Sequence, residues 1–249
     1  MPFRVKPVDL EKAIDAIRAL NIRGLNITIP HKVNVMRYLD ELEPLAEKIG
    51  AVNTVVNNNG KLKGYNTDAA GFIQALTAAG VQPLKRKVAL LGAGGAARAI
   101  AFVLAENGAE LSILNRKQEL DWAEKLAAGV NKAYHNSFRA MEMNEKNIKK
   151  VLGKADILVN ATSVGMLPNV DETPVSADLL RPALLVYDVV YNPIETKLLK
   201  EAKLAGAGTI GGLDMLVGQG AIAFELWMGE KAPVEVMKIA AVEALRHRR

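Results

Sequence analysis

The chain has 249 residues, of which 50% are hydrophobic and 24% charged, and its formal net charge is +5 at pH 7. This composition is that of a globular protein with room for one large domain or two small ones, and no apolar run approaches the ~20 residues of a membrane span. The absence of cysteine excludes disulfides, thiolate metal sites and cysteine nucleophiles, and it favours a cytoplasmic location.

The first 45 residues predict two helices and a short strand. Residues 9–20 place apolar side chains at helical spacing, and residues 25–29 predict a strand that ends at Pro30. A second helix is expected after it, because apolar residues again recur at helical spacing: Val33, Met36, Leu39 and Leu42.

A β-hairpin and a third helix follow. Residues 52–56 and 62–65 flank Asn59-Gly60, a dipeptide typical of two-residue hairpin turns. With such a turn, Asn53 would lie opposite Asn66. The helix is expected to begin at Asn66-Thr67-Asp68 and to end at Gly80.

Regular alternation of strands and helices begins near Lys87. Helices are expected at 95–107 and 195–205, the second with Asn192 as its cap, and the strands are expected at 88–91, 111–114, 157–159, 185–190 and near 209–210. This order predicts an α/β fold with a doubly wound, Rossmann-like parallel sheet.

The change of pattern also predicts where the domains begin and end. We expect a nucleotide-binding domain at 68–211, and a smaller α/β substrate domain formed by 1–67 and by the helical residues 212–249. The basic run Arg246–Arg249 ends the chain without interleaved aromatic residues, so it does not indicate nucleic-acid binding.

A glycine-rich loop joins the first strand of the alternating region to its helix. The strand runs into Gly92-Ala93-Gly94-Gly95-Ala96-Ala97, a dinucleotide fingerprint with alanine at its third small position. Gly92 would allow the tight turn and Gly94 the close approach of a pyrophosphate, whose charge the helix N-terminus would stabilise. The alternative is a tight strand–helix turn without a ligand.

Cofactor preference is indicated at the end of the next strand. Enzymes that use NAD usually carry an acid there for the ribose 2′-hydroxyl. This chain has Asn115-Arg116, and a guanidinium can bind a 2′-phosphate through charge-assisted hydrogen bonds. The pattern therefore favours NADP, unless Arg116 is simply a surface residue at a strand end.

Lys32 and Asp68 are the candidate reactive side chains. If Lys32 lies in the first turn of the expected helix, the helix dipole disfavours its charge, although it could also be a solvated surface lysine. The hairpin would bring Asn53 close to Asp68 at an edge that faces the nucleotide domain, and clefts between domains are common ligand sites. Asp68 could instead only cap its helix.

Eight segments of the chain, in order, resemble the shikimate dehydrogenase family. They are Asn-Ile-Thr-Ile-Pro-His-Lys at 26–32, Gly-Ala-Val-Asn-Thr at 50–54, Tyr-Asn-Thr-Asp at 65–68, Gly-Ala-Gly-Gly-Ala at 92–96, Asn-Arg at 115–116, Asn-Ala-Thr-Ser-Val-Gly-Met at 160–166, Tyr-Asn-Pro at 191–193 and Gly-Gly-Leu-Asp-Met-Leu-Val-Gly-Gln at 211–219. Family members also carry an upstream Ser-Leu-Ser-Pro loop that binds the substrate carboxylate, whereas the first serine here is Ser112.

The resemblance implies reversible reduction of 3-dehydroshikimate to shikimate with NADPH, in the biosynthesis of chorismate and aromatic amino acids. By position, Lys32 and Asp68 match the family's proton-transferring pair, and no metal is expected. The implied substrate contacts are Thr28, Asn53, Tyr191 and Gln219. The implied cofactor contacts are Gly92, Ala93, Gly94, Gly95, Ala96, Asn115, Arg116, Val189 and Gly212.

Two alternatives to this activity remain open. One is a related dehydrogenase that uses quinate, and the other is a non-catalytic NADP-binding regulatory protein. For a shikimate or a quinate dehydrogenase, the expected partner is a small-molecule substrate, and neither nucleic acid nor a membrane is expected to bind. The chain would be a monomer or a homodimer. Which member of the Lys32–Asp68 pair carries the proton is not decided by the sequence.

Overall fold

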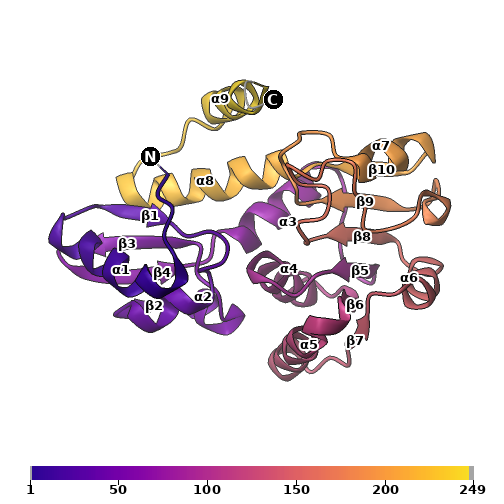
Figure 1. Ribbon diagram of the computed structural model, residues 1–249, viewed down its shortest axis with the longest axis horizontal. Coiled ribbons are helices and arrows are strands. Elements are labelled where there is room, and N and C mark those ends of the chain that lie inside the picture. Colours follow the sequence, from indigo (N-terminus) through magenta and orange to yellow (C-terminus); the bar gives the residue numbers. More distant parts are fainter. Residues whose placement is uncertain (1, 247–249) are drawn as a thin grey trace.

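The computed structural model describes residues 2–246, which form two sheets joined by long helices (Figure 1). The basic residues 247–249 lie outside the described part of the chain. Within 2–246, no helix combines the length and the apolar character that crossing a membrane requires.

The smaller sheet has four strands in the order β1-β3-β4-β2. Its strands are β1 (Gly24–Asn26), β2 (Glu41–Leu42), β3 (Thr54–Asn58) and β4 (Lys61–Tyr65), and α1 (Leu10–Ala19) and α2 (Pro44–Ile49) accompany them. The predicted hairpin is confirmed, because β3 and β4 pair antiparallel around Asn59 and Gly60, whose φ angles are 54° and 90°. Its last pair, Thr54 with Tyr65, places Asn53 opposite Asn66 as expected.

The helix expected from Val33 to Leu42 is wrong. A 3₁₀ helix, Asn34–Tyr38, is followed by β2, which pairs in parallel with β4. The reason is tertiary, since Leu39 and Leu42 both pack over Gly64, where a Cβ atom would lie 2.6 Å from Leu39 Cδ1 and 3.1 Å from Leu42 Cδ2. The strand expected at 25–29 is also shorter and ends at Asn26.

The larger sheet is parallel and has six strands in the order β10-β9-β8-β5-β6-β7. The strands are β5 (Lys87–Leu91), β6 (Glu110–Asn115), β7 (Arg139–Glu142), β8 (Ile157–Asn160), β9 (Leu185–Asp188) and β10 (Gly208–Ile210). Its helices are α4 (Gly95–Glu106), α5 (Leu120–Tyr134), α6 (Glu145–Leu152) and α7 (Lys197–Leu204). The expected α/β class with a Rossmann-like parallel sheet is confirmed. The edge strand β7 was not predicted, because Arg139–Glu142 has no apolar run.

The start of α7 differs from the expectation. Thr196, and not Asn192, is the cap, since the Thr196 hydroxyl accepts from the Leu199 amide and donates to Asp188. Thr196 is fully buried. A contact with the neighbouring strand therefore decides where this helix begins.

Two long helices join the sheets (Figure 1). They are α3 (Asp68–Ala78), which begins as expected, and α8 (Gly212–Met228), which α9 (Val234–Arg246) follows. The far end of α8 contacts the smaller sheet, because the Trp227 indole donates to Val55 O at 3.0 Å and Arg23 donates to Trp227 O at 3.0 Å. The domain boundaries near 67 and 212 stay a prediction.

Close packing of α3 on α8 depends on Gly71. A Cβ atom there would lie 2.8 Å from Gln219 N and 2.9 Å from Met215 O, both of them backbone atoms. We expect Gly71→Ala to lower the free energy of unfolding by about 1–3 kcal/mol, as overpacking does. Urea unfolding measures this. The matched control is Gly129→Ala in α5, where the nearest atom to a Cβ is 3.8 Å away and the change should be neutral or stabilising. Equal effects would contradict the packing argument.

Candidate active site

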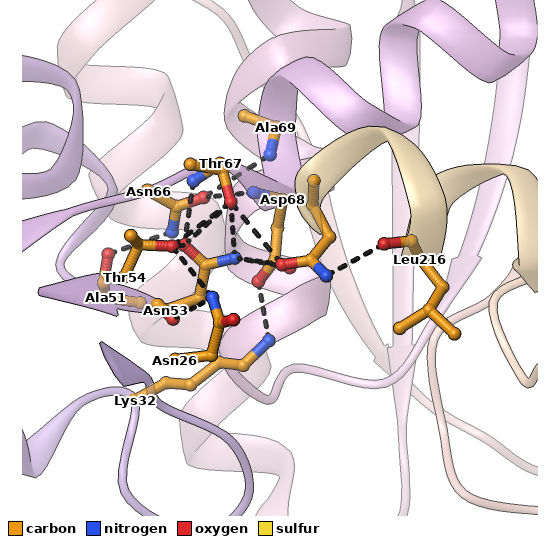
Figure 2. A network of polar contacts seen from close by, with 11 residues as sticks. Asn26, Lys32, Ala51, Asn53, Thr54, Asn66, Thr67, Asp68, Ala69 and Leu216 are labelled. Carbon is orange, nitrogen blue, oxygen red and sulfur yellow. Dashed lines mark hydrogen bonds and ion pairs between the residues drawn. The ribbon is translucent and has the colours of Figure 1, made fainter. Parts of the chain in front are cut away.

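A lysine–carboxylate pair lies where α3 begins (Figure 2). Lys32 Nζ donates to Asp68 Oδ2 at 2.6 Å, and their side chains are only 14% and 6% exposed. Lys32 lies in a turn ahead of the short 3₁₀ helix, so the expectation that it occupies the first turn of an α-helix is wrong. What distinguishes Lys32 is this contact with a buried carboxylate.

Asn53 fixes the second oxygen of that carboxylate (Figure 2). Its Nδ2 lies 3.0 Å from Asp68 Oδ1, 2.9 Å from Thr67 Oγ1 and 3.1 Å from Gln219 Oε1. The two amide protons are shared among these three acceptors. The structure thus brings Asn53, Asp68 and Gln219 together from three elements.

Asp68 is not the cap of α3. The Asn66 side-chain oxygen accepts from the Asp68 amide at 3.1 Å and from the Ala69 amide at 3.3 Å. The Asn66 Nδ2 group donates to Ala51 O at 2.9 Å. Because Asn66 satisfies the helix start, both Asp68 oxygens are free to bind Lys32 and Asn53.

The glycine loop between β5 and α4 has the form that a pyrophosphate requires. Gly92 has a φ of 98°, and a Cβ there would lie 2.9 Å from Ala161 O. Gly94 is exposed, a Cβ there would meet nothing within 4 Å, and no side chain caps the amides of α4. Ala93 and Ala96 complete the loop. The residues therefore fit NADP, whose phosphates free amides at a helix N-terminus can bind.

Lys32 touches this loop. A Cβ on Gly95, the first residue of α4, would lie 2.9 Å from Lys32 Cδ and 3.0 Å from Lys32 Cβ. The apolar stem of Lys32 therefore passes over the start of α4. This contact places the Lys32–Asp68 pair beside the expected cofactor loop.

Arg116 follows the carboxyl end of β6, and the glycine loop follows the carboxyl end of the parallel strand β5 beside it. It forms an ion pair with Glu119, and the guanidinium holds the Glu119 pKa below its usual value. Asn115 is buried and donates to Glu119 O at 2.8 Å. The Arg116 side chain is 64% exposed, so a ligand phosphate can reach it in competition with Glu119.

The remaining predicted residues fall into two groups. Val189 and Gly212 are in contact, since a Cβ on Gly212 would lie 2.3 Å from Val189 O. Thr28 is exposed after β1, and Tyr191 is 41% exposed after β9. The described contacts of the Lys32–Asp68 pair include neither Thr28 nor Tyr191.

A buried carboxylate that is not among the predicted site residues connects two loops. Asp188 is fully buried at the end of β9 and accepts from Asn160 at 2.9 Å, Thr196 at 2.6 Å and the Val190 amide at 3.1 Å. Burial raises the pKa of Asp188 to about 6, against the effect of these hydrogen bonds. An acid near the end of an apolar strand was the available signal.

The Asp188 titration should be measurable. The ordinary pKa of an aspartate is 3.8, so with that value in the unfolded chain the folded state binds more protons than the unfolded chain between about pH 4 and pH 6. The contribution of Asp188 to the free energy of unfolding should therefore decrease as the pH rises through this window, by roughly 3 kcal/mol in total. Urea unfolding of the wild type and of Asp188→Asn across this range isolates the effect, and a difference independent of pH would contradict it.

Comparisons with known proteins agree with this geometry. Residues 1–55 match the family model "Shikimate dehydrogenase substrate binding domain", residues 75–182 match "Shikimate / quinate 5-dehydrogenase" and residues 212–241 match "Shikimate 5'-dehydrogenase C-terminal domain". A shikimate dehydrogenase (NADP(+)) of Dehalococcoides mccartyi is 48% identical over 98% of this chain and 85% of its own length.

Two solved structures extend the comparison. A crystal structure of a shikimate dehydrogenase in complex with NADP⁺ has a TM-score of 0.89 and 42% identity, covering 98% of this chain and 84% of that one. A quinate dehydrogenase from Corynebacterium glutamicum, in complex with NAD, has a TM-score of 0.85 and 34% identity over 97% and 85% of the two chains. Sequence identity of this extent over almost the whole chain is decisive: the chain belongs to the shikimate dehydrogenase family.

Proposed function

We propose that the chain catalyses the reversible, NADP-dependent interconversion of 3-dehydroshikimate and shikimate, with Lys32 and Asp68 as the proton-transferring pair. Two observations together support the proposal. The two side chains are 2.6 Å apart, and the Lys32 side chain packs against Gly95. These contacts support the proposal because they put side chains that can transfer a proton beside the loop that fits the cofactor.

The chemistry requires one hydride and one proton. A bound NADP would provide the hydride acceptor for alcohol oxidation, and a bound NADPH the hydride donor for carbonyl reduction. In oxidation, the Lys32–Asp68 pair takes the hydroxyl proton as the C–H bond gives up its hydride. In reduction, the pair returns that proton to the developing alkoxide.

Substrate contacts are proposed from the same network. Asn53 and Gln219 lie within hydrogen-bond distance of one another beside Asp68, and we propose that a substrate hydroxyl exchanges with one of these contacts when it binds. Thr28 and Tyr191 are exposed, and we propose that they complete the substrate site. Val189 and Gly212, which are in contact with each other, are proposed to lie by the nicotinamide.

Quinate is the second candidate substrate, because one matching family model covers both acids and one similar structure is a quinate dehydrogenase. The test is to assay the purified protein for reduction of NADP and of NAD, each with shikimate and with quinate. The highest kcat/KM is expected for shikimate with NADP. A preference for quinate, or no turnover with either acid, would contradict the proposal.

A non-catalytic binder would need neither Lys32 nor Asp68, whereas the chain keeps both in contact with one another. The substrate is a small molecule. Cytoplasmic location and a monomeric or homodimeric state stay predictions from the sequence.

A further inference from the structure

One polar contact of α4 has no part in the chemistry proposed above. Arg98, in the first turn of α4, donates from Nε to Ile49 O at 3.0 Å. Ile49 ends α2, and the last carbonyls of a helix attract a cation. None of the ion pairs between described residues includes Arg98. Partial burial lowers the pKa of its guanidinium, and the hydrogen bond to Ile49 O is the one described for its side chain.

The backbone beside Ile49 is shaped to receive this side chain. Gly50 has a φ of 70°, and a Cβ there would lie 2.8 Å from Arg98 Nη2. A second cation, Lys48, lies 3.9 Å from the centroid of the Tyr134 ring in α5. Helix α2 of the smaller sheet therefore contacts α4 through Arg98 and α5 through Lys48, and of these two helices only α4 begins at the glycine loop.

The segment that Arg98 holds continues directly into the Lys32–Asp68 site. Ala51 O accepts from the Asn66 side chain, which in turn accepts from the Asp68 amide (Figure 2). The Val52 amide donates to Lys32 O at 2.8 Å. The Lys32 backbone is thus bonded directly to Val52, three residues beyond Ile49, and the Asp68 backbone is linked to Ala51 through the Asn66 side chain.

We propose that Arg98 is a positioning residue for the reaction proposed above. Helix α4 carries the glycine loop at its start and Arg98 one turn later. By binding the end of α2, Arg98 fixes the distance between that loop and the Lys32–Asp68 pair. The reaction needs this distance to be short, because hydride and proton transfer both depend on close placement of the reacting groups.

The test compares Arg98→Met, which keeps an apolar stem and removes the guanidinium, with Lys48→Met, a control in the same interface. Arg98→Met should lower kcat by about tenfold to a hundredfold, leave the Kd of NADP within about twofold, and change the kinetic isotope effect with deuterated NADPH. Lys48→Met should leave kcat and the isotope effect unchanged. A merely structural role for Arg98 would lower thermal stability without altering the isotope effect.

Two outcomes would overturn the role of Arg98. One is an equal loss of kcat in both variants, and the other is a loss of NADP affinity as large as the loss of kcat. Because the inference rests on the proposed function, amide hydrogen exchange at residues 49–53 supplies a measurement that needs no turnover. Exchange there should be faster in Arg98→Met than in the wild type or Lys48→Met. Unchanged exchange would refute the positioning role even if the wild type proved inactive with both acids.

Discussion

Replacement of Lys32 by alanine is expected to lower kcat for shikimate oxidation by about 10²–10⁴, the range typical of a lost general acid–base group. The physical reason is that the variant leaves Asp68, with Asn53 as its remaining partner, and no ammonium beside the loop. The Kd of NADP should change little, since the stem of Lys32 only rests on Gly95. Steady-state kinetics and calorimetric titration of NADP measure the two quantities.

Lys61→Ala is the matched control for this prediction. Lys61 also pairs with a carboxylate, Glu41, but its side chain is 61% exposed on the smaller sheet. Exposed pairs of this kind contribute little, so kcat should stay close to that of the wild type. If Lys32→Ala retained near-normal turnover, the pair would not be the proton-transferring group.

Replacement of Arg116 by alanine is expected to weaken NADP binding by about tenfold to a hundredfold and to leave NAD binding nearly unchanged. Only NADP carries the 2′-phosphate, and a guanidinium at the end of β6 can bind that phosphate through two hydrogen bonds. The preference of kcat/KM for NADP over NAD should fall by the same factor. Titration of both cofactors gives the comparison directly.

Glu119→Gln is the counterpart of this variant. Glu119 pairs with Arg116 and would compete with the phosphate, so its neutralisation should strengthen NADP binding by a few-fold at most, about what an exposed pair contributes. NAD binding should not respond. Equal losses for NADP and NAD in Arg116→Ala would mean that Arg116 does not bind the 2′-phosphate.

The sequence by itself determined the elements whose signals are local. The glycine loop after a buried strand, the Asn59-Gly60 turn and the start of α3 each depend on residues within a few positions of one another. The alternation of strands and helices likewise determined the parallel sheet, because only that sheet buries such strands on both faces. The hairpin register even placed Asn53 near Asp68, since pairing from a two-residue turn fixes every later pair.

Tertiary structure decided the features that depend on residues far apart in the chain. Packing of Leu39 and Leu42 over Gly64 replaced an expected helix by a 3₁₀ turn and a strand, although the apolar spacing suited a helix. The bond from Thr196 to Asp188 moved the start of α7.

The same holds for the site. No local pattern shows that Lys32 rests on Gly95 or that Arg98 binds the end of α2, because each contact joins residues about fifty or more positions apart. The sequence supplied the proposed reactive groups, whereas their distances from the glycine loop follow from how α2, α3 and α8 pack against α4 and one another. Such packing depends on complementary shapes of side chains from different elements, and the periodicity along one element does not encode these shapes.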